Sequence, residues 1–292
     1  MGTGRFITDL KRRFSQGDTV MQLIYVNAAV FLAVAVCNIV TTLFNLPPAA
    51  WLQWLELSAN PETFVRQPWS LFTYMFMHAG VSHILFNMLW LYWFGRLFLN
   101  FFSSKHLRGL YVLGGICGGL LFMLFYNVFP YFDDKSPWIV GASASVLAIV
   151  VASGVREPNC PVQFMFIGVV RLKYVAAFMV VLDLLFMTSS NAGGHIAHLG
   201  GALSGWWFAA GLSKGHDATK WINGVLDFFS VRRRKKPKMK VYYGDKQKDY
   251  DFNARKKERE AEVDRILDKL RKSGYGSLTE EEKKRLFDAS KK

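Results

Sequence analysis

The chain has 292 residues, of which 51% are hydrophobic and 15% aromatic, and its formal net charge is +14. This composition excludes an ordinary soluble domain and is typical of a protein that crosses a membrane several times. From Lys214 onward the chain holds 24 basic and 14 acidic residues, a difference of +10, so most of the charge lies in the C-terminal tail.

Apolar runs along the chain predict six membrane-spanning helices. A spanning helix needs about 20 apolar residues, and the last three runs are shorter than the first three. The first run is too long for the core of a signal peptide, and no small-residue cleavage site follows it, so we expect it to stay in the protein. The predicted spans are residues 20–44, 81–102, 107–129, 138–155, 173–188 and 194–213.

Basic residues in the short loops predict the orientation of these spans, because cytoplasmic loops carry an excess of Lys and Arg. The bases gather before the first span and in alternate loops, whereas the opposite loops carry only Arg66 and Lys135. Both termini are therefore predicted to be cytoplasmic, and spans two, four and six enter from the outer face. The cytoplasmic bases are Arg5, Lys11, Arg12, Arg13, Lys105, Arg108, Arg156, Arg171, Lys173 and the run 232–236.

The segment between the first two spans contains two tryptophans among polar residues. In "PPAAWLQWLELSANPETFVRQPW", Trp51 and Trp54 alternate with leucines over about one helical turn. Such a pattern predicts a helix that lies in the membrane interface and does not cross it.

The fourth span contains "GASAS", in which Ser143 stands between small residues. Counting about 1.5 Å per residue from Trp138, an expected interface anchor, puts Ser143 on the order of 8 Å below the outer surface. His198 lies near the start of the sixth span, which enters from the same face. In the second span His83 and Asn87 are four residues apart and so share one helix face. Polar side chains from three spans are thus expected at one depth.

This combination is suited to hydrolysis. Imidazole can take the proton of a serine hydroxyl, which is otherwise a weak nucleophile, and a His/Asn pair of donors can stabilise the resulting oxyanion. Gly141 leaves the approach to Ser143 open, and the Ser143 amide near a helix start faces the developing charge. Polar groups of this kind face a bundle interior or a water-filled cavity. Taken alone, the serine motif is also compatible with simple helix packing.

The sequence resembles the rhomboid family of intramembrane serine proteases in "QPWSLFTYMFMHAGVSHILFNM", "GASAS" and "GGHIAHLGGALSG", and the resemblance covers roughly residues 20–213. It implies a serine–histidine dyad, a cavity that opens outward, and no metal or organic cofactor. The implied roles are nucleophile for Ser143, general base and acid for His198, oxyanion hole for His83 and Asn87, supporting positions for His78 and Gly141, and close packing of span six on span four for Gly201 and Gly205.

Some positions depart from the family pattern. Leu147 stands where the family often has an aromatic residue that stacks on the base, so another group must orient His198. Asp183 in the fifth span is an acid inside the membrane, which marks a candidate functional position, with local hydrogen bonding as the alternative. We interpret His195 as structural or interfacial, because His198 matches the family's H-x-G-G spacing.

The tail after the last span is predicted to form two short cytoplasmic helices, the second with a capping box of Thr279 and Glu282. The run "RRRKKPKMK" has no zinc spacing or RNA-binding signature near it, which argues against nucleic acid. It is expected to contact anionic lipid headgroups or only to set the topology. The helices would bind a cytoplasmic partner or pack on the bundle. The apolar positions of the first helix are Val263, Ile266, Leu267 and Leu270.

The sequence therefore predicts an all-α, six-span rhomboid-like bundle of residues 20–213, between a cytoplasmic segment (1–19) and a basic helical tail (214–292). We expect an endopeptidase of a bacterial inner membrane that cleaves single-span membrane proteins near the outer face. The resemblance also implies that substrates enter past the fifth span, with movement of the "SSNAGG" loop above it, which we expect Gly193 and Gly194 to make mobile. The alternatives are a catalytically silent binder of transmembrane segments and a small transporter, which the one-sided polar cluster disfavours.

Overall fold

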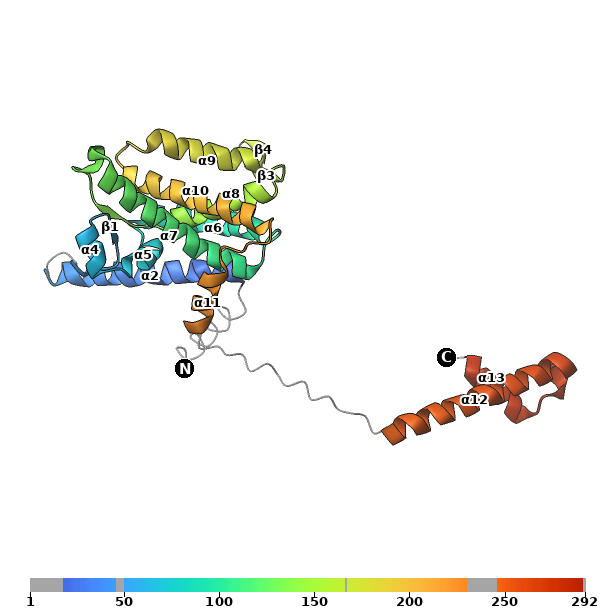
Figure 1. Cartoon of the computed structure of the whole chain (residues 1–292). Helices are drawn as coiled ribbons and strands as arrows, with labels where there is room; N and C mark the ends of the chain where they lie inside the picture. Colours follow the sequence, from blue (N-terminus) through green and yellow to red (C-terminus); the bar gives the residue numbers. More distant parts are fainter. Residues whose placement is uncertain (1–17, 46–49, 166, 230–245, 291–292) are drawn as a thin grey trace. The chain divides into compact units, whose positions relative to one another are not determined.

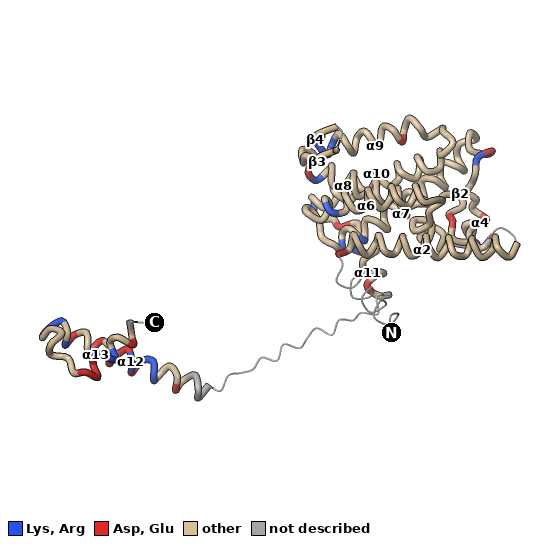
Figure 2. The backbone as a smooth tube through the Cα atoms, turned by 180° about the vertical axis from the view of Figure 1, so that it is seen from behind, with Lys and Arg blue, Asp and Glu red and all other residues tan. Residues whose placement is uncertain are grey.

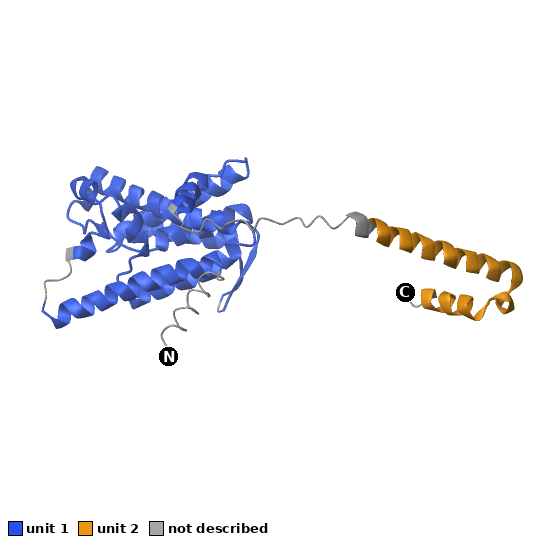
Figure 3. Ribbon diagram, turned by 90° about the horizontal axis from the view of Figure 1, so that it is seen from below, with its two compact units in different colours: residues 1–231 blue, residues 232–292 orange. Residues whose placement is uncertain are grey.

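The computed structural model describes residues 18–45, 50–165, 167–229 and 246–290. The chain divides into two compact units, residues 1–231 and 232–292 (Figure 3). The first unit is a bundle of long helices in which α10 packs against α7, α8 and α9 (Figure 1). These helices are α2 (Thr19–Leu43), α6 (Val81–Phe98), α7 (Ser104–Val128), α8 (Ser143–Arg156), α9 (Leu172–Phe186) and α10 (Ala192–Leu212).

Each predicted span overlaps one of these long helices. Within the described residues, α2 and α7 are long and apolar enough to cross a membrane, and α8 is a shorter apolar helix. Charged residues gather toward the ends of the bundle, whereas most of each helix is uncharged (Figure 2). Helix α9 carries a single acidic residue, Asp183. The number of six spans stays a prediction, and the basic residues before Asp18 and in 232–240 lie outside the described residues.

The segment between α2 and α6 does not form the single interfacial helix that its tryptophans predict. Asn60 ends the extended stretch by accepting hydrogen bonds from the N–H groups of Glu62 and Thr63, and Pro61 starts a new helix, where its fixed φ and missing N–H are tolerated. Leu57 pairs with Ile139 in a two-stranded antiparallel sheet. The short elements here are α3 (Ala50–Gln53), β1 (Leu57–Ser58), α4 (Pro61–Arg66), α5 (Ser70–Thr73), the 3-10 helix η1 (Tyr74–Phe76), and β2 (Trp138–Ile139).

The fourth helix begins five residues later than predicted, at Ser143. Trp138 lies in β2, and Gly141 has a φ of +136°, a backbone conformation that residues with a side chain rarely adopt. The depth of Ser143 estimated from a helical rise is therefore wrong, because an extended residue advances about 3.3 Å rather than about 1.5 Å.

Glycines bring α7, α8 and α10 into backbone contact. A Cβ atom at Gly201 would overlap the carbonyl oxygen of Ala144, and one at Gly205 would overlap that of Ala148. At Gly118 of α7, the added atom would lie 2.7 Å from both the Cβ of Ala144 and the carbonyl oxygen of Ala197. Small residues allow this close approach, which is how helices associate where lipid removes the hydrophobic driving force.

A buried polar network holds α2 against the centre of the bundle. The amide of Asn27 donates to the Tyr111 hydroxyl at 3.0 Å, and that hydroxyl donates to the carbonyl oxygen of Met75 at 3.0 Å. Asn27 and Tyr111 are both fully buried. Because buried polar groups without partners are costly, these bonds fix the position of α2 on α7 and η1.

The first unit continues past residue 213, where the predicted bundle ends. Helix α11 (Lys220–Phe229) packs on the start of α7, where Arg108 donates to Asn223 at 2.8 Å and to Asp227 at 2.6 Å. A Cβ at Gly109 would lie 2.6 Å from that of Thr219. The remaining elements of this unit are η2 (Pro130–Phe132) and the hairpin of β3 (Pro161–Phe164) and β4 (Gly168–Arg171).

The second unit contains the two predicted tail helices, although the first of them is long, with 28 residues. The capping box is confirmed: the Thr279 N–H donates to a carboxylate oxygen of Glu282 at 2.8 Å, and the Glu282 N–H donates to the Thr279 hydroxyl at 3.3 Å. Lys269 bonds Glu282 across the pair, and Ile266 is buried between them. The elements are α12 (Lys246–Ser273), η3 (Tyr275–Ser277) and α13 (Glu280–Ser290).

Candidate active site

Ser143 is the first residue of α8 and is half-buried. The N–H groups of a first helical turn have no carbonyl partner within the helix, so the Ser143 amide is available to an anion at this point. The preceding Gly141 is anchored by its N–H, which donates to the carbonyl oxygen of Tyr74 at 3.0 Å. The backbone thus turns sharply just before the serine and presents hydroxyl and amide together.

His83 of α6 faces the same space as the serine hydroxyl. A Cβ atom at Gly141 would lie 2.9 Å from Nε2 of His83 and 3.6 Å from Oγ of Ser143. The Ala79 N–H donates to Nδ1 of His83 at 3.3 Å. Since Nδ1 is the acceptor, the proton of the neutral ring sits on Nε2. His83 therefore offers a hydrogen-bond donor beside the hydroxyl.

Asn87 and His78 surround His83 from two sides. Asn87 lies one turn further along α6, and its amide donates to the His83 carbonyl oxygen at 2.9 Å, which leaves a second N–H of the amide for another acceptor. The His78 ring packs edge-on against the His83 ring with centroids 5.1 Å apart. Both ring nitrogens of His78 are buried and have no hydrogen-bond partner among the described residues.

His198 of α10 has the opposite proton arrangement. Its Nδ1 lies 2.8 Å from a carboxylate oxygen of Asp183, and because a carboxylate only accepts, Nδ1 carries the proton and Nε2 keeps a lone pair. Ala144 and Ala197, which adjoin Ser143 and His198 in the sequence, both lie against Gly118 of α7. The structure thus brings Ser143, His83 and His198 to one region of the bundle.

Asp183 is the group that orients His198 in place of the aromatic ring that Leu147 does not provide. Its side chain is 8% exposed, and Oδ1 accepts a hydrogen bond of 2.8 Å from His198 and another of 2.8 Å from His195. The sequence marks Asp183 as a candidate functional position, with local hydrogen bonding as the alternative, and it does not identify His195 as a partner of this acid. Among the described residues, Asp183, His195 and His198 offer three potential metal-ligand atoms that lie within 4.8 Å of one another.

The loop between α9 and α10 differs from the expectation. Gly193 and Gly194 lie in the first turn of α10 and not in a glycine-rich loop. A Cβ at Gly193 would meet Ile139 and Phe122 at 2.9 Å, so this glycine allows the start of α10 to approach α7 and β2 closely. The expectation that these two glycines belong to the loop is therefore wrong, and the mobility of the loop stays a prediction.

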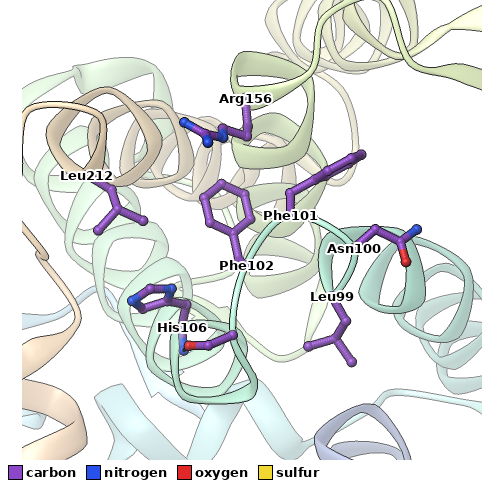
Figure 4. Close-up of a pocket in the computed structure, with 8 residues that line it drawn as sticks. Leu99, Asn100, Phe101, Phe102, His106, Arg156 and Leu212 are labelled. Atoms are coloured by element: carbon purple, nitrogen blue, oxygen red, sulfur yellow. Dashed lines mark hydrogen bonds between the residues drawn. The ribbon is translucent and has the colours of Figure 1, made fainter. Parts of the chain in front are cut away.

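A cavity of about 400 Å³ lies elsewhere in the bundle, beside Arg156 at the other end of α8 (Figure 4). The 14 residues of α8 separate it from Ser143 by about 20 Å. Its serine, Ser103, caps α7 by accepting a hydrogen bond from the N–H of His106. In Figure 4 the Phe102 ring stands between Arg156 and His106. The cavity therefore has no part in the candidate active site.

Comparison with known proteins matches residues 65–215 to a family model described as the rhomboid domain, and residues 246–292 to a family of unknown function (DUF6576). "RHOMBOID-like protein 12, mitochondrial" from Arabidopsis thaliana is 28% identical over 145 residues, which cover 46% of this chain and 43% of that protein.

"Rhomboid protease GlpG" from Klebsiella pneumoniae (strain 342) is 26% identical over 180 residues, which cover 61% of this chain and 60% of the relative. The protein of the same name from Salmonella newport (strain SL254) is 25% identical over 190 residues, with coverages of 62% and 56%. The chain thus spans about half the length of the curated relatives that it matches.

Proposed function

The chain belongs to the rhomboid family, and from this premise we propose that it is an intramembrane serine endopeptidase whose nucleophile is Ser143 and whose base is His198. One observation carries the proposal: the hydrogen bonds that fix the two histidines give them opposite tautomers. His198 presents a lone pair on Nε2, whereas His83 presents a proton on Nε2. One ring can accept the serine proton, and the other can donate to an oxyanion.

In the first step, Nε2 of His198 takes the proton of the Ser143 hydroxyl as the oxygen attacks the peptide carbonyl. The ring becomes positively charged, and the Asp183 carboxylate on its Nδ1–H stabilises that charge. His198 then gives the proton to the leaving amine, which breaks the peptide bond. Water attacks the acyl group in the second half of the reaction, again with His198 as base.

The developing oxyanion is stabilised by three donors: Nε2–H of His83, the free N–H of the Asn87 amide and the backbone N–H of Ser143. Donors of this kind act most strongly where water is excluded, and the loss of one lowers the rate by about 10²–10³-fold in other serine proteases. Gly141 leaves room for His83 beside the hydroxyl. His78 packs on His83 and supports the orientation of its ring.

The proposed substrates are transmembrane proteins, cleaved near the outer face of a bacterial inner membrane with both termini of this chain in the cytoplasm. A transmembrane helix hides its carbonyl groups in its own hydrogen bonds, so the cleaved segment has to unwind first. Substrates would reach the site past α9. Exposed apolar side chains support contact of α9 with lipid: Phe178, Val181, Leu184 and Leu185. The basic run after α11 would contact anionic lipid headgroups.

The test is cleavage of a single-span reporter protein by the purified full chain in proteoliposomes. Wild type is expected to cleave the reporter and Ser143→Ala is not. Ser145→Ala is the matched control, because its hydroxyl is fully buried two residues away and has no hydrogen-bond partner among the described residues. Reporter that binds to wild type without being cleaved would support the silent binder instead.

A further inference from the structure

A carboxylate and two imidazoles meet between α9 and α10, although the proposed chemistry uses only one of the imidazoles. We propose that Asp183, His195 and His198 form a binding site for a divalent transition metal such as Zn²⁺, and that occupancy of this site switches off the serine. The metal site stands by itself, whereas its inhibitory effect rests on the proposed function.

The three ligand atoms already converge. Nδ1 of His195 and Nδ1 of His198 each lie 2.8 Å from Oδ1 of Asp183, and each of the three residues offers a ligand atom within 4.8 Å of those of the other two. Zinc binds nitrogen and carboxylate oxygen at about 2.0–2.2 Å, so tetrahedral ligands stand about 3.3 Å apart. Each Nδ1–Oδ1 distance would have to lengthen by about 0.5 Å to reach that spacing, a movement that side-chain rotation can supply. The fourth position remains open to water.

Both the helix positions and the exposure of the side chains suit a metal. His195 and His198 are three residues apart on α10 and therefore share a face, while Asp183 comes from the adjacent α9. Asp183 is buried, with 8% of its side chain exposed, but each histidine side chain is 22% exposed, so an ion can reach the imidazole edge. A buried carboxylate between two neutral rings attracts a cation, which would displace the two Nδ1 protons.

Metal at Nδ1 would remove the base function of His198. A neutral imidazole has one lone pair, so when Nδ1 coordinates a metal the ring proton must sit on Nε2. That nitrogen can then no longer accept the proton of Ser143. Metal binding would therefore replace the hydrogen bond from Nδ1 of His198 to Asp183, which leaves the lone pair on Nε2, with a metal–Nδ1 bond that requires the proton on Nε2.

The ligand set also predicts which metals bind. Imidazole nitrogens favour Zn²⁺, Cu²⁺ and Ni²⁺, whereas Mg²⁺ and Ca²⁺ prefer sites made only of oxygen. Zinc is the best probe because it brings no redox chemistry. In this role the metal is an inhibitor of the proposed reaction and not its cofactor.

The first measurement is Zn²⁺ binding to full-length Ser143→Ala, prepared without a polyhistidine tag, by equilibrium dialysis. One tightly bound equivalent is expected, and adding either Asp183→Asn or His195→Gln should weaken it at least about tenfold, because each removes one of three ligands. His106→Gln is the matched control, because this histidine lies in the first turn of α7 and not in the cluster. Its Nε2 is 3.5 Å from a carboxylate oxygen of Asp217. Binding that neither cluster variant weakens would overturn the proposal.

The second measurement follows the rate at which a fluorophosphonate probe labels the serine, with and without Zn²⁺, and reads the ratio of the two rates for each protein. Wild type should be inhibited at least about tenfold, with recovery after chelation, and the ratio for His195→Gln should return close to one. Equal inhibition of both proteins would contradict the switch. If Ser143→Ala binds zinc through the cluster while wild type never labels, the metal site stands and the protease proposal fails.

Discussion

Substitution of Gly141 by alanine tests the geometry beside Ser143 most sharply. The new Cβ would lie 2.9 Å from both Cε1 and Nε2 of His83, a separation that real Cβ atoms do not show, so the ring has to move. The φ of +136° adds backbone strain of about 1–3 kcal/mol. The loss of one hydrogen-bond donor to the oxyanion lowers the rate about 10²–10³-fold. We expect the fluorophosphonate labelling rate of Gly141→Ala to fall about 100-fold.

Gly168→Ala separates the strain from the clash. Gly168 also has a positive φ, +85°, but a Cβ there would meet nothing within 4 Å. This variant should lose some thermal stability and label at a rate within about threefold of wild type, because only the strain is shared between the two positions. If a folded Gly141→Ala protein labels as fast as Gly168→Ala, His83 does not act beside the serine and the reasoning fails.

Three further substitutions test a close helix contact, a buried hydrogen-bond network and a helix cap. Gly201→Ala should lower the melting temperature in detergent, because its Cβ would overlap the Ala144 carbonyl oxygen and overpacking costs about 1–3 kcal/mol. The control is Gly80→Ala, whose Cβ would meet nothing within 4 Å, and equal melting temperatures of the two variants would disprove the close contact of α8 and α10. Tyr111→Phe should destabilise the bundle by about 1–3 kcal/mol, because the buried Asn27 amide and the Met75 carbonyl oxygen each lose a hydrogen-bond partner. Tyr92→Phe, at an exposed tyrosine, should not destabilise it. An unchanged melting curve for Tyr111→Phe would contradict the proposed role of the network. Thr279→Ala removes the capping box and should lower the stability of α13 by about 1 kcal/mol, which would speed its amide hydrogen exchange in the full chain about fivefold. Thr279→Ser should exchange as slowly as wild type. Unchanged exchange in Thr279→Ala would refute the contribution of the cap.

The apolar runs predicted the approximate positions of the long helices, because each of these helices is apolar over most of its length. They did not predict the pairing of Leu57 with Ile139, since strand pairing between distant segments is a tertiary contact. That pairing holds residues 138–139 extended and delays the start of α8 to Ser143. The interfacial helix failed for a local reason that the sequence does contain, the Asn60–Pro61 signal for a new helix start.

In the candidate site, the spacing of His83 and Asn87 on one helix face was sufficient to place them together. The contact of Asp183 with His198 could not be predicted from the sequence, because it depends on how α9 is rotated about its own axis against α10. The absence of an aromatic residue at Leu147 was the available signal that another group must hold the base.

The decisive experiment on the proposed nucleophile is labelling of the purified full chain by a fluorophosphonate probe, followed by mapping of the modified peptide. We expect wild type to be labelled on Ser143 and His198→Ala to remain unlabelled. Asp183→Asn should label more slowly, and Ser145→Ala should label normally. A label on Ser145 would contradict the assignment of Ser143 as the nucleophile. So would labelling of Ser143 that continues at the wild-type rate in His198→Ala.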